Sequence, residues 1–201
     1  MSASAAPAIR SVGAAELRSV TAVLVDALLD GDLAPWLAAD RVRRSTIYPG
    51  YLGMLAEPLL EHGSANMIGN DAVALWIRVE ELLPPEPRDY ETRLRQMCGP
   101  QVQRFADLDS AIIRNHPTMR PHAYLAFLAV TPSAQGQGLG SALLDHVHEH
   151  LDAIGLPAYL EATGSRNRQL YLRHGFEDYG DPFPVGLGGP FLYPMWRDPR
   201  T

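Results

Sequence analysis

Gln135-Gly136-Gln137-Gly138-Leu139-Gly140 is the stretch that decides the fold of this chain. It follows His122 to Val130, an apolar run with the length and content of a strand, and it leads into Leu139 to Leu151, where apolar residues have helical spacing. A glycine-rich turn between a strand and a helix can aim successive backbone N–H groups at one point before the positive end of the helix. Glycines also allow a bulky anion to approach without Cβ clashes. The stretch therefore predicts a phosphate-binding loop.

Two other phosphate-binding motifs fit this loop less well. A P-loop needs Lys followed by Ser or Thr after its last glycine, but Gly140 is followed by Ser and Ala. A dinucleotide-binding turn is closer, because two of the glycines have its spacing and Glu161 is an acid at the end of the next strand. That turn must be tight, whereas Thr131 to Gln135 separate the strand from the first glycine. Too little chain follows Glu161 for further parallel crossovers.

The rest of the chain alternates between helical and strand patterns. Helical spacing is found in Glu16 to Leu29, in a stretch from Pro35 to about Glu61 that we expect to be interrupted near Pro49, and in Tyr90 to Cys98, Gln101 to Asn115 and Asn167 to His174. Strand patterns are found in Asn66 to Ile68 and Ala72 to Val79, joined as a hairpin by Gly69-Asn70-Asp71, and in Ala158 to Ala162, Phe176 to Tyr179 and Pro190 to Trp196. This order predicts an α/β protein with a mixed sheet and helices on both faces.

The length of 201 residues suits one domain, which we place at residues 1–201. Residues 1–8 are small and polar, so we expect a flexible tail and no secretory signal. Residues 80–121 are expected to form a helical insertion before the main strand, beginning with the proline-rich segment Leu83-Pro84-Pro85-Glu86-Pro87. No apolar stretch is long enough to cross a membrane.

Charge and cysteine content exclude several kinds of partner and site. The net charge of −6 argues against nucleic-acid binding, which needs a concentrated excess of basic residues. The cluster Arg41-Val42-Arg43-Arg44 is interpreted as a solvated helix end. The single cysteine, Cys98, excludes an internal disulfide and a CxxC metal site, and the alternating His146, His148 and His150 fall on different faces of a helix. We expect a cytoplasmic protein without a metal, as a monomer or homodimer.

Two motifs carry a resemblance to a known family. The pattern Gln135-x-x-Gly138-x-Gly140 matches the motif shared by the GNAT acetyltransferases: Gln or Arg, two residues, Gly, one residue, and Gly or Ala. Tyr171-Leu172-Arg173-His174-Gly175-Phe176 matches their Tyr-x-x-x-Gly-Phe signature, in the expected order and spacing. The chain therefore resembles this family, most clearly over Ala123 to Glu177. The resemblance implies the GNAT fold, with a mostly antiparallel sheet that is splayed at the cofactor site, and acetyl-coenzyme A (acetyl-CoA) as the cofactor.

Within the family, the chain is most similar to puromycin N-acetyltransferase and its relatives. The phrases that carry this similarity are Gln-Gly-Gln-Gly-Leu-Gly-Ser-Ala at 135–142, Pro157-Ala158-Tyr159-Leu160-Glu161, and Arg166-Asn167 leading to Tyr171. The amino-terminal half, which shapes the acceptor pocket in the family, resembles these enzymes less. The resemblance implies that the acceptor is a primary amine of a small molecule, either antibiotic-like or metabolic.

The resemblance also implies which residues bind the cofactor. The exposed backbone of the main strand is expected to pair with the pantetheine arm, and the glycine loop to hold the pyrophosphate. Many relatives have an asparagine seven residues before the signature tyrosine, where this chain has Gly164; Asn167, four residues before it, is expected to contact pantetheine instead. The expected set is Phe127, Leu128, Ala129, Val130, Gln135, Gly136, Gln137, Gly138, Leu139, Gly140, Ser141, Asn167 and Tyr171.

Two residues are assigned to the chemistry of amide formation. Tyr171 matches the family tyrosine near the thioester sulfur, and a phenol with an ordinary pKa near 10 can donate a proton to the departing thiolate as general acid. A tyrosine that only packs between helix and sheet is the alternative. Glu161, late on the strand beside the splayed one, is the leading general base, although it could instead be a structural acceptor or a substrate anchor. His122 and Tyr124 are weaker candidates for the base.

Three functions are compatible with this sequence. The first is acetylation of a small-molecule amine, and the second is acetylation of a protein N-terminus or lysine. The third is a non-catalytic acyl-CoA sensor domain. An intact glycine loop together with Tyr171 favours an enzyme over a sensor. No feature of the sequence cleanly separates a small-molecule acceptor from a peptide acceptor, although the insertion at 80–121 is placed where it could close an open peptide groove.

Overall fold

The computed structural model describes residues 7–80 and 86–200, and its centre is one mixed sheet. The strands lie in the order β1-β2-β3-β4-β5-β8-β6, with β7 paired to β8, and every pair is antiparallel except β4 with β5. The strands are β1 Ile9–Val12, β2 Ser64–Ile68, β3 Ala72–Val79, β4 His122–Val130, β5 Ala158–Ala162, β6 Glu177–Asp178, β7 Phe183–Pro184 and β8 Phe191–Arg197. The mostly antiparallel pairing confirms the predicted α/β class and excludes a doubly wound dinucleotide-binding sheet.

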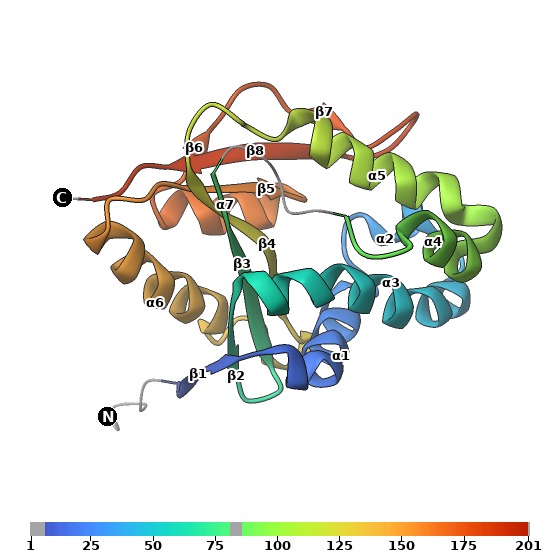
Figure 1. Ribbon diagram of the computed structural model, residues 1–201, viewed down its shortest axis with the longest axis horizontal. Coiled ribbons are helices and arrows are strands. Elements are labelled where there is room, and N and C mark those ends of the chain that lie inside the picture. The colour runs from blue at the N-terminus through green and yellow to red at the C-terminus, as the bar shows by residue number, and fades with distance from the viewer. Residues whose placement is uncertain (1–6, 81–85, 201) are drawn as a thin grey trace.

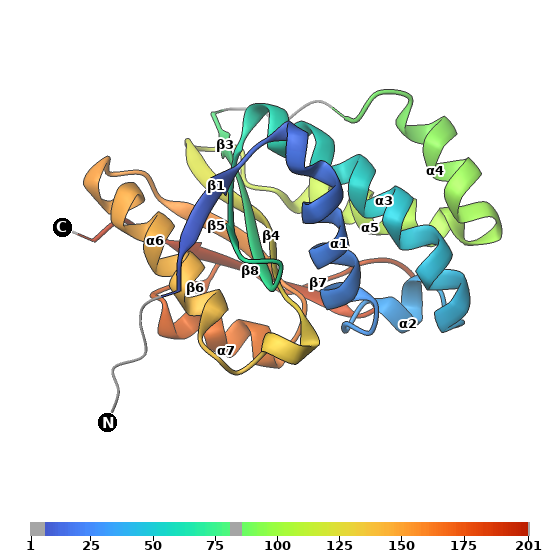
Figure 2. The ribbon, with the colours of Figure 1, turned by 90° about the horizontal axis from the view of Figure 1, so that it is seen from below.

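Helices cover both faces of the sheet, as predicted (Figures 1 and 2). One face carries α1 Leu17–Leu28, α2 Ala34–Leu37 and α3 Arg41–His62, with α4 Tyr90–Cys98 and α5 Val102–Asn115 packed on α3 and α2. The other face carries α6 Leu139–Ala153 and α7 Ser165–Arg173. Short 3₁₀ turns lie at Ala14–Glu16, Gly99–Gln101 and Pro132–Ala134.

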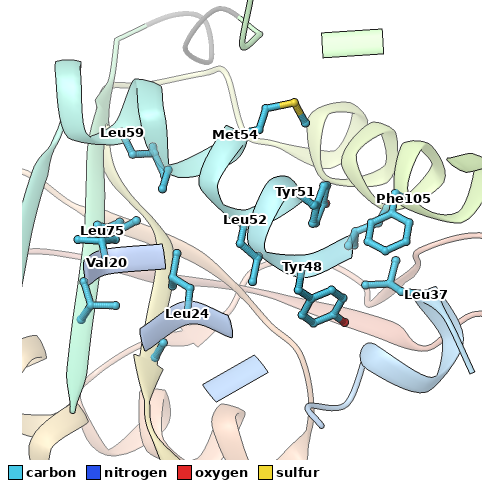
Figure 3. Close-up of a cluster of buried hydrophobic side chains, with 14 of the residues drawn as sticks. Val20, Leu24, Leu37, Tyr48, Tyr51, Leu52, Met54, Leu59, Leu75 and Phe105 are labelled. Carbon is cyan, nitrogen blue, oxygen red and sulfur yellow. The ribbon is translucent and has the colours of Figure 1, made fainter. Parts of the chain in front are cut away.

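The central strand β3 shows how the sheet divides the core into two layers. Its side chains alternate, because successive residues of a strand point to opposite faces. Val73, Leu75 and Ile77 belong to the larger cluster with α1 and α3, whereas Ala74 and Trp76 belong to the cluster with α6 and α7. Figure 3 shows part of the larger cluster, in which the α3 side chains Tyr48, Tyr51, Leu52, Met54 and Leu59 lie near Val20 and Leu24 of α1, Leu37 of α2, Leu75 of β3 and Phe105 of α5.

The predicted interruption of a helix near Pro49 is wrong, because α3 runs unbroken through Pro49 and Pro58. A proline inside a helix removes one backbone hydrogen bond and strains the preceding turn. Tertiary packing outweighs this cost here, since ten residues of α3 are buried. At Gly50, Met97 of α4 comes so close that a Cβ atom would collide with its sulfur.

The interpretation of the arginine cluster as a solvated helix end is wrong for Arg44, which is buried. Its guanidinium donates to the backbone oxygens of Leu29 at 2.9 Å and Ala38 at 2.7 Å, and it pairs with Asp30 at 3.1 Å. Arg44 therefore ties the start of α3 to the connection between α1 and α2.

The remaining predicted elements are confirmed, with shifts of a few residues at their ends, and two short strands were not predicted. The hairpin β2–β3, both insertion helices, β4, α6, β5 and α7 lie where the pattern placed them. Strands β1 and β7 have four and two residues, too few to show a period. Most of the predicted tail at 1–8, and residues 81–85 of the predicted insertion, lie outside the described residues. Over the described part of the chain, none of the helices has the length and apolar character to cross a membrane.

Candidate active site

The parallel strands β4 and β5 separate soon after they meet. Their pairing covers only Ala123 with Ala158 and Tyr124 with Tyr159. On the other side, β4 stays paired to β3 as far as Val130, but a bulge inserts Ala126, since Leu75 pairs with Phe127 while Trp76 pairs with Leu125. Beyond the bulge, alternate backbone groups of β4 have no partner strand on the β5 side. The structure thus contains the splay that the family resemblance implies.

The glycine loop lies at the end of the splayed strand and begins α6. Gly136 and Gly138 have φ of +79° and +81°, which favours glycine at both positions. Gly138 is the N-cap of α6 and has no side chain that could accept from the first-turn N–H groups, so these remain available to an anion. The side chains of Gln135 and Gln137 brace the loop by donating to the backbone oxygens of residues 130 and 133, at 3.2 and 3.3 Å.

A cavity of about 680 Å³ opens from the gap between β4 and β5 toward α3 and α5. It brings together five predicted site residues: Phe127 and Leu128 of β4, Glu161 of β5, and Asn167 and Tyr171 of α7. Its wall is mostly apolar and includes Leu28, Leu33, Leu37, Leu52, Leu55, Leu59, Leu108, Ile112, Leu125, Phe127, Leu128, Leu160 and Leu192.

Tyr171 lies in this cavity with its ring edge-on to Phe176, at 5.8 Å between ring centroids. Burial raises the pKa of its hydroxyl well above the ordinary value for tyrosine. The phenol is therefore protonated at neutral pH and can donate a proton. Asn167, one helical turn earlier, donates its amide to the Thr163 hydroxyl at 2.9 Å.

Glu161 is the penultimate residue of β5 and lines the cavity. Its side chain is only 4% exposed. Tyr124 and Tyr159 lie beside it: burial raises the pKa of both hydroxyls, and the negative charge of Glu161 raises it further. The Nδ1 atom of the buried His116 lies 3.8 Å from its Oε1. The carboxylate thus lies beside two protonated tyrosine hydroxyls and one imidazole nitrogen.

His116 connects Glu161 to a second buried histidine. Its Nε2 lies 2.9 Å from Nε2 of His122, whose Nδ1 donates to the backbone oxygen of Arg120 at 2.9 Å. Burial lowers the pKa of His122, so this ring is neutral and its Nε2 accepts from His116. His116 therefore presents Nδ1 to Glu161. His122 itself is fully buried behind His116 and does not line the cavity, whereas Tyr124 does.

Gly164 lies where many relatives have asparagine, and the structure gives a physical reason for the glycine. Gly164 is the N-cap of α7, and a Cβ atom there would collide with the carboxylate of Asp32, from the connection after α1. No side chain fits at position 164 while the Asp32 carboxylate occupies that space.

Ser141, another expected cofactor residue, places its hydroxyl 3.0 Å from Nε2 of His174, so its side chain faces the end of α7.

A separate polar hollow lies between α6 and the end of β8. Asp145, His148 and His174 place one ligand atom each within 4.8 Å of one another, which is metal-like spacing. Burial, reinforced by the charge of Arg197, lowers the pKa of His148 to about 3. Three arginines line the same hollow and oppose cation binding: Arg173, Arg197 and Arg200. The absence of a metal site stays a prediction.

The strand that leaves its parallel neighbour, the glycine loop at a helix N-terminus and the cavity all meet at the same gap in the sheet. Residues 105–178 match the model of the acetyltransferase (GNAT) domain. This segment is therefore a GNAT acetyltransferase domain, and such a domain implies an acyltransferase that uses acetyl-CoA.

Solved structures similar to this chain include several acetyltransferases. One, described as histone acetyltransferase HPA2 and related acetyltransferase from Corynebacterium glutamicum, is 25% identical, with 98% of each chain covered and a TM-score of 0.70. Arylalkylamine N-acetyltransferase 2 from Aedes aegypti is 16% identical, with 96% of this chain and 99% of that chain covered and a TM-score of 0.58. An agmatine N-acetyltransferase is 13% identical, with the same coverage and a TM-score of 0.58. The last two likenesses show the fold alone.

Acetyl-CoA or CoA should raise the melting temperature of the protein, because a ligand that binds only the folded state stabilises it by mass action. At 100 times its Kd the gain is about 2.7 kcal/mol. Gly138→Val should abolish this shift, since a β-branched side chain resists a φ of +81° and would displace the N–H groups of the loop. Thermal melts with and without CoA measure both effects.

Gly155→Val is the matched control for this substitution. Gly155 also has a positive φ, +65°, and open space around its Cβ position, but it lies beyond the other end of α6. Both variants should lose stability, and only Gly138→Val should lose the CoA shift. If CoA raised the melting temperature of both variants equally, the glycine loop would not be part of the cofactor site.

Proposed function

We propose that this enzyme transfers the acetyl group to the primary amine of a small molecule, directly and without an acyl-enzyme. The observation that carries this proposal is the cavity itself. Its outer wall is built by the insertion, with Tyr90 of α4 and Leu108 and Ile112 of α5. A peptide would need an open groove, whereas this site is a pocket of the size that takes a small molecule.

The charge of the cavity favours a cationic acceptor. Four carboxylates line it, and none of its described lining residues is arginine: the acids are Asp32, Glu86, Asp109 and Glu161. Acidic groups in a low-dielectric pocket attract ammonium ions and raise their local concentration. The apolar wall binds the hydrocarbon part of the same molecule.

In the proposed mechanism, acetyl-CoA supplies the thioester, and this chain supplies the proton transfers. Glu161 takes a proton from the incoming ammonium, with His116 beside it, so that the amine nitrogen becomes a nucleophile. Backbone N–H groups on the open side of β4 donate to the carbonyl oxygen, where negative charge develops. The amine nitrogen then bonds to the thioester carbon, and Tyr171 gives its proton to the sulfur as the carbon–sulfur bond breaks. The new amide nitrogen loses its second proton to solvent, from which Tyr171 is reprotonated.

The cofactor contacts remain part of the proposal. The segment Phe127, Leu128, Ala129 and Val130 offers its alternate backbone groups, those on the β5 side, to the pantetheine arm, and the loop from Gln135 to Ser141 offers N–H groups to the pyrophosphate. Asn167 faces the cavity one turn before Tyr171. The family likeness to puromycin N-acetyltransferase makes antibiotic-like amines a group worth testing beside metabolic amines.

A panel of acceptors tests the proposed class. Small primary amines, nucleoside antibiotics and short peptides are compared by kcat/KM, measured from the thiol released by acetyl-CoA. We expect small amphipathic amines to exceed peptides in kcat/KM by about tenfold or more, because a pocket of this size suits a small molecule. Preference for peptides would overturn the small-molecule assignment, and thiol release with no acceptor would indicate simple hydrolysis.

A further inference from the structure

A second carboxylate, Asp109 of α5, lies in the wall of the acceptor cavity. Its Oδ1 accepts a hydrogen bond from the Tyr51 hydroxyl at 2.6 Å, and its Oδ2 accepts one from the Tyr90 hydroxyl. The two tyrosines come from α3 and α4, so three helices fix the position of one carboxylate. The two hydrogen bonds therefore hold the Asp109 carboxylate in one position.

Asp109 has no cationic partner among the ion pairs of residues 7–80 and 86–200. Its surroundings are apolar or acidic, and burial raises its pKa to about 6, while the two tyrosine hydroxyls act in the opposite direction. Glu86, at the same cavity, adds a further negative charge. A partly buried carboxylate without a counter-ion is costly, and a cation beside it would relieve that cost.

Asp109 and Glu161 belong to one cavity but to different walls, α5 and β5. The Tyr124 hydroxyl responds to both: burial raises its pKa most, Glu161 next, and Asp109 by a smaller contribution. Apolar side chains such as Leu108 and Ile112 line the same space. The cavity therefore offers two anionic sites joined by hydrocarbon surface.

We propose that the acceptor is a diamine, with one amine at Glu161 and Tyr171 for acetylation and the second, cationic group bound by Asp109 with its Tyr51 and Tyr90 partners. This inference rests on the proposed acetylation of small amines. It adds a binding role for Asp109, a residue that does not touch the reacting atoms. Charge-assisted hydrogen bonds to the second ammonium would then fix the length of the preferred substrate.

The test compares α,ω-diamines with monoamines of equal chain length in the parent and in Asp109→Asn, at about pH 8, where Asp109 is ionised. The parent should favour the diamine by about 10- to 100-fold in kcat/KM, the value of a hydrogen bond to a charged group. Asp109→Asn should lose that preference, because its kcat/KM should fall further for the diamine than for the monoamine of equal length. Asp107→Asn, the same change on the same helix outside the cavity, should keep the preference.

A chain-length series in the parent keeps the test open if Asp109→Asn fails to fold. Diamine kcat/KM should peak at one length, because the two anionic sites lie a fixed distance apart, whereas monoamine values should rise steadily with added methylenes. Acetylation of monoamines with no diamine preference and no peak would overturn the Asp109 site alone. A parent that acetylates neither series would instead contradict the proposed function.

Discussion

Tyr171→Phe is expected to lower kcat by about 10²- to 10⁴-fold, the usual contribution of a positioned general acid. The phenylalanine keeps the ring and its edge-on contact with Phe176, so the fold and the CoA-dependent thermal shift should match those of the parent. The loss should fall on kcat and kcat/KM alike, because the proton is given to sulfur only as the thioester breaks. Steady-state kinetics with a saturating amine measure it.

Tyr179→Phe is the matched control, since Tyr179 is exposed and lies outside the cavity. It should leave both kcat and KM unchanged. Full turnover of Tyr171→Phe, under conditions where chemistry limits the rate, would make Tyr171 a packing residue and leave the mechanism without its acid.

Glu161→Gln is expected to have the second-largest effect, and one that depends on pH. Near neutral pH the acceptor amine is almost entirely protonated, because alkyl ammonium groups have pKa values near 10. Removing the base should then lower kcat/KM by about 10²-fold or more. As the pH rises toward the pKa of the amine, more acceptor arrives neutral, so the variant should approach the parent. Paired pH profiles of kcat/KM measure this convergence.

Glu177→Gln removes the same charge from the surface strand β6 and should follow the parent at every pH. A loss in Glu161→Gln that stays equal across the profile would assign Glu161 to structure or substrate anchoring. In that case His116, whose Nδ1 faces the carboxylate, would be the next group to test as the base.

The cofactor side of the fold could be predicted because its signals are local. β4, the glycine loop and α6 follow one another without interruption, and each has a clear period or turn signal. Tyr171 and Glu161 were found from motif position and strand order. The structure shows in addition that Tyr171 and Glu161 line one cavity and that the hydroxyls of Tyr124 and Tyr159 lie beside Glu161.

The acceptor side could not be predicted, because its residues come from distant parts of the chain. Asp109 is one polar residue on an amphipathic helix, and nothing local shows that Tyr51 and Tyr90 lie beside it. His116 follows the end of α5, where helical periodicity no longer applies. The error at Pro49 has a similar origin, since burial of α3 against its neighbours overrides a local helix-breaking signal.

Product analysis tests whether this protein moves the acetyl group from acetyl-CoA directly to an amine. The parent is incubated with acetyl-CoA and an amphipathic primary amine, and mass spectrometry and thiol titration are applied to the same sample. Direct transfer predicts one acetyl group on the amine nitrogen for each thiol released, with the acetyl group absent from the protein. An acetyl group that accumulates on the protein, or thiol release without acetylated amine, would contradict it.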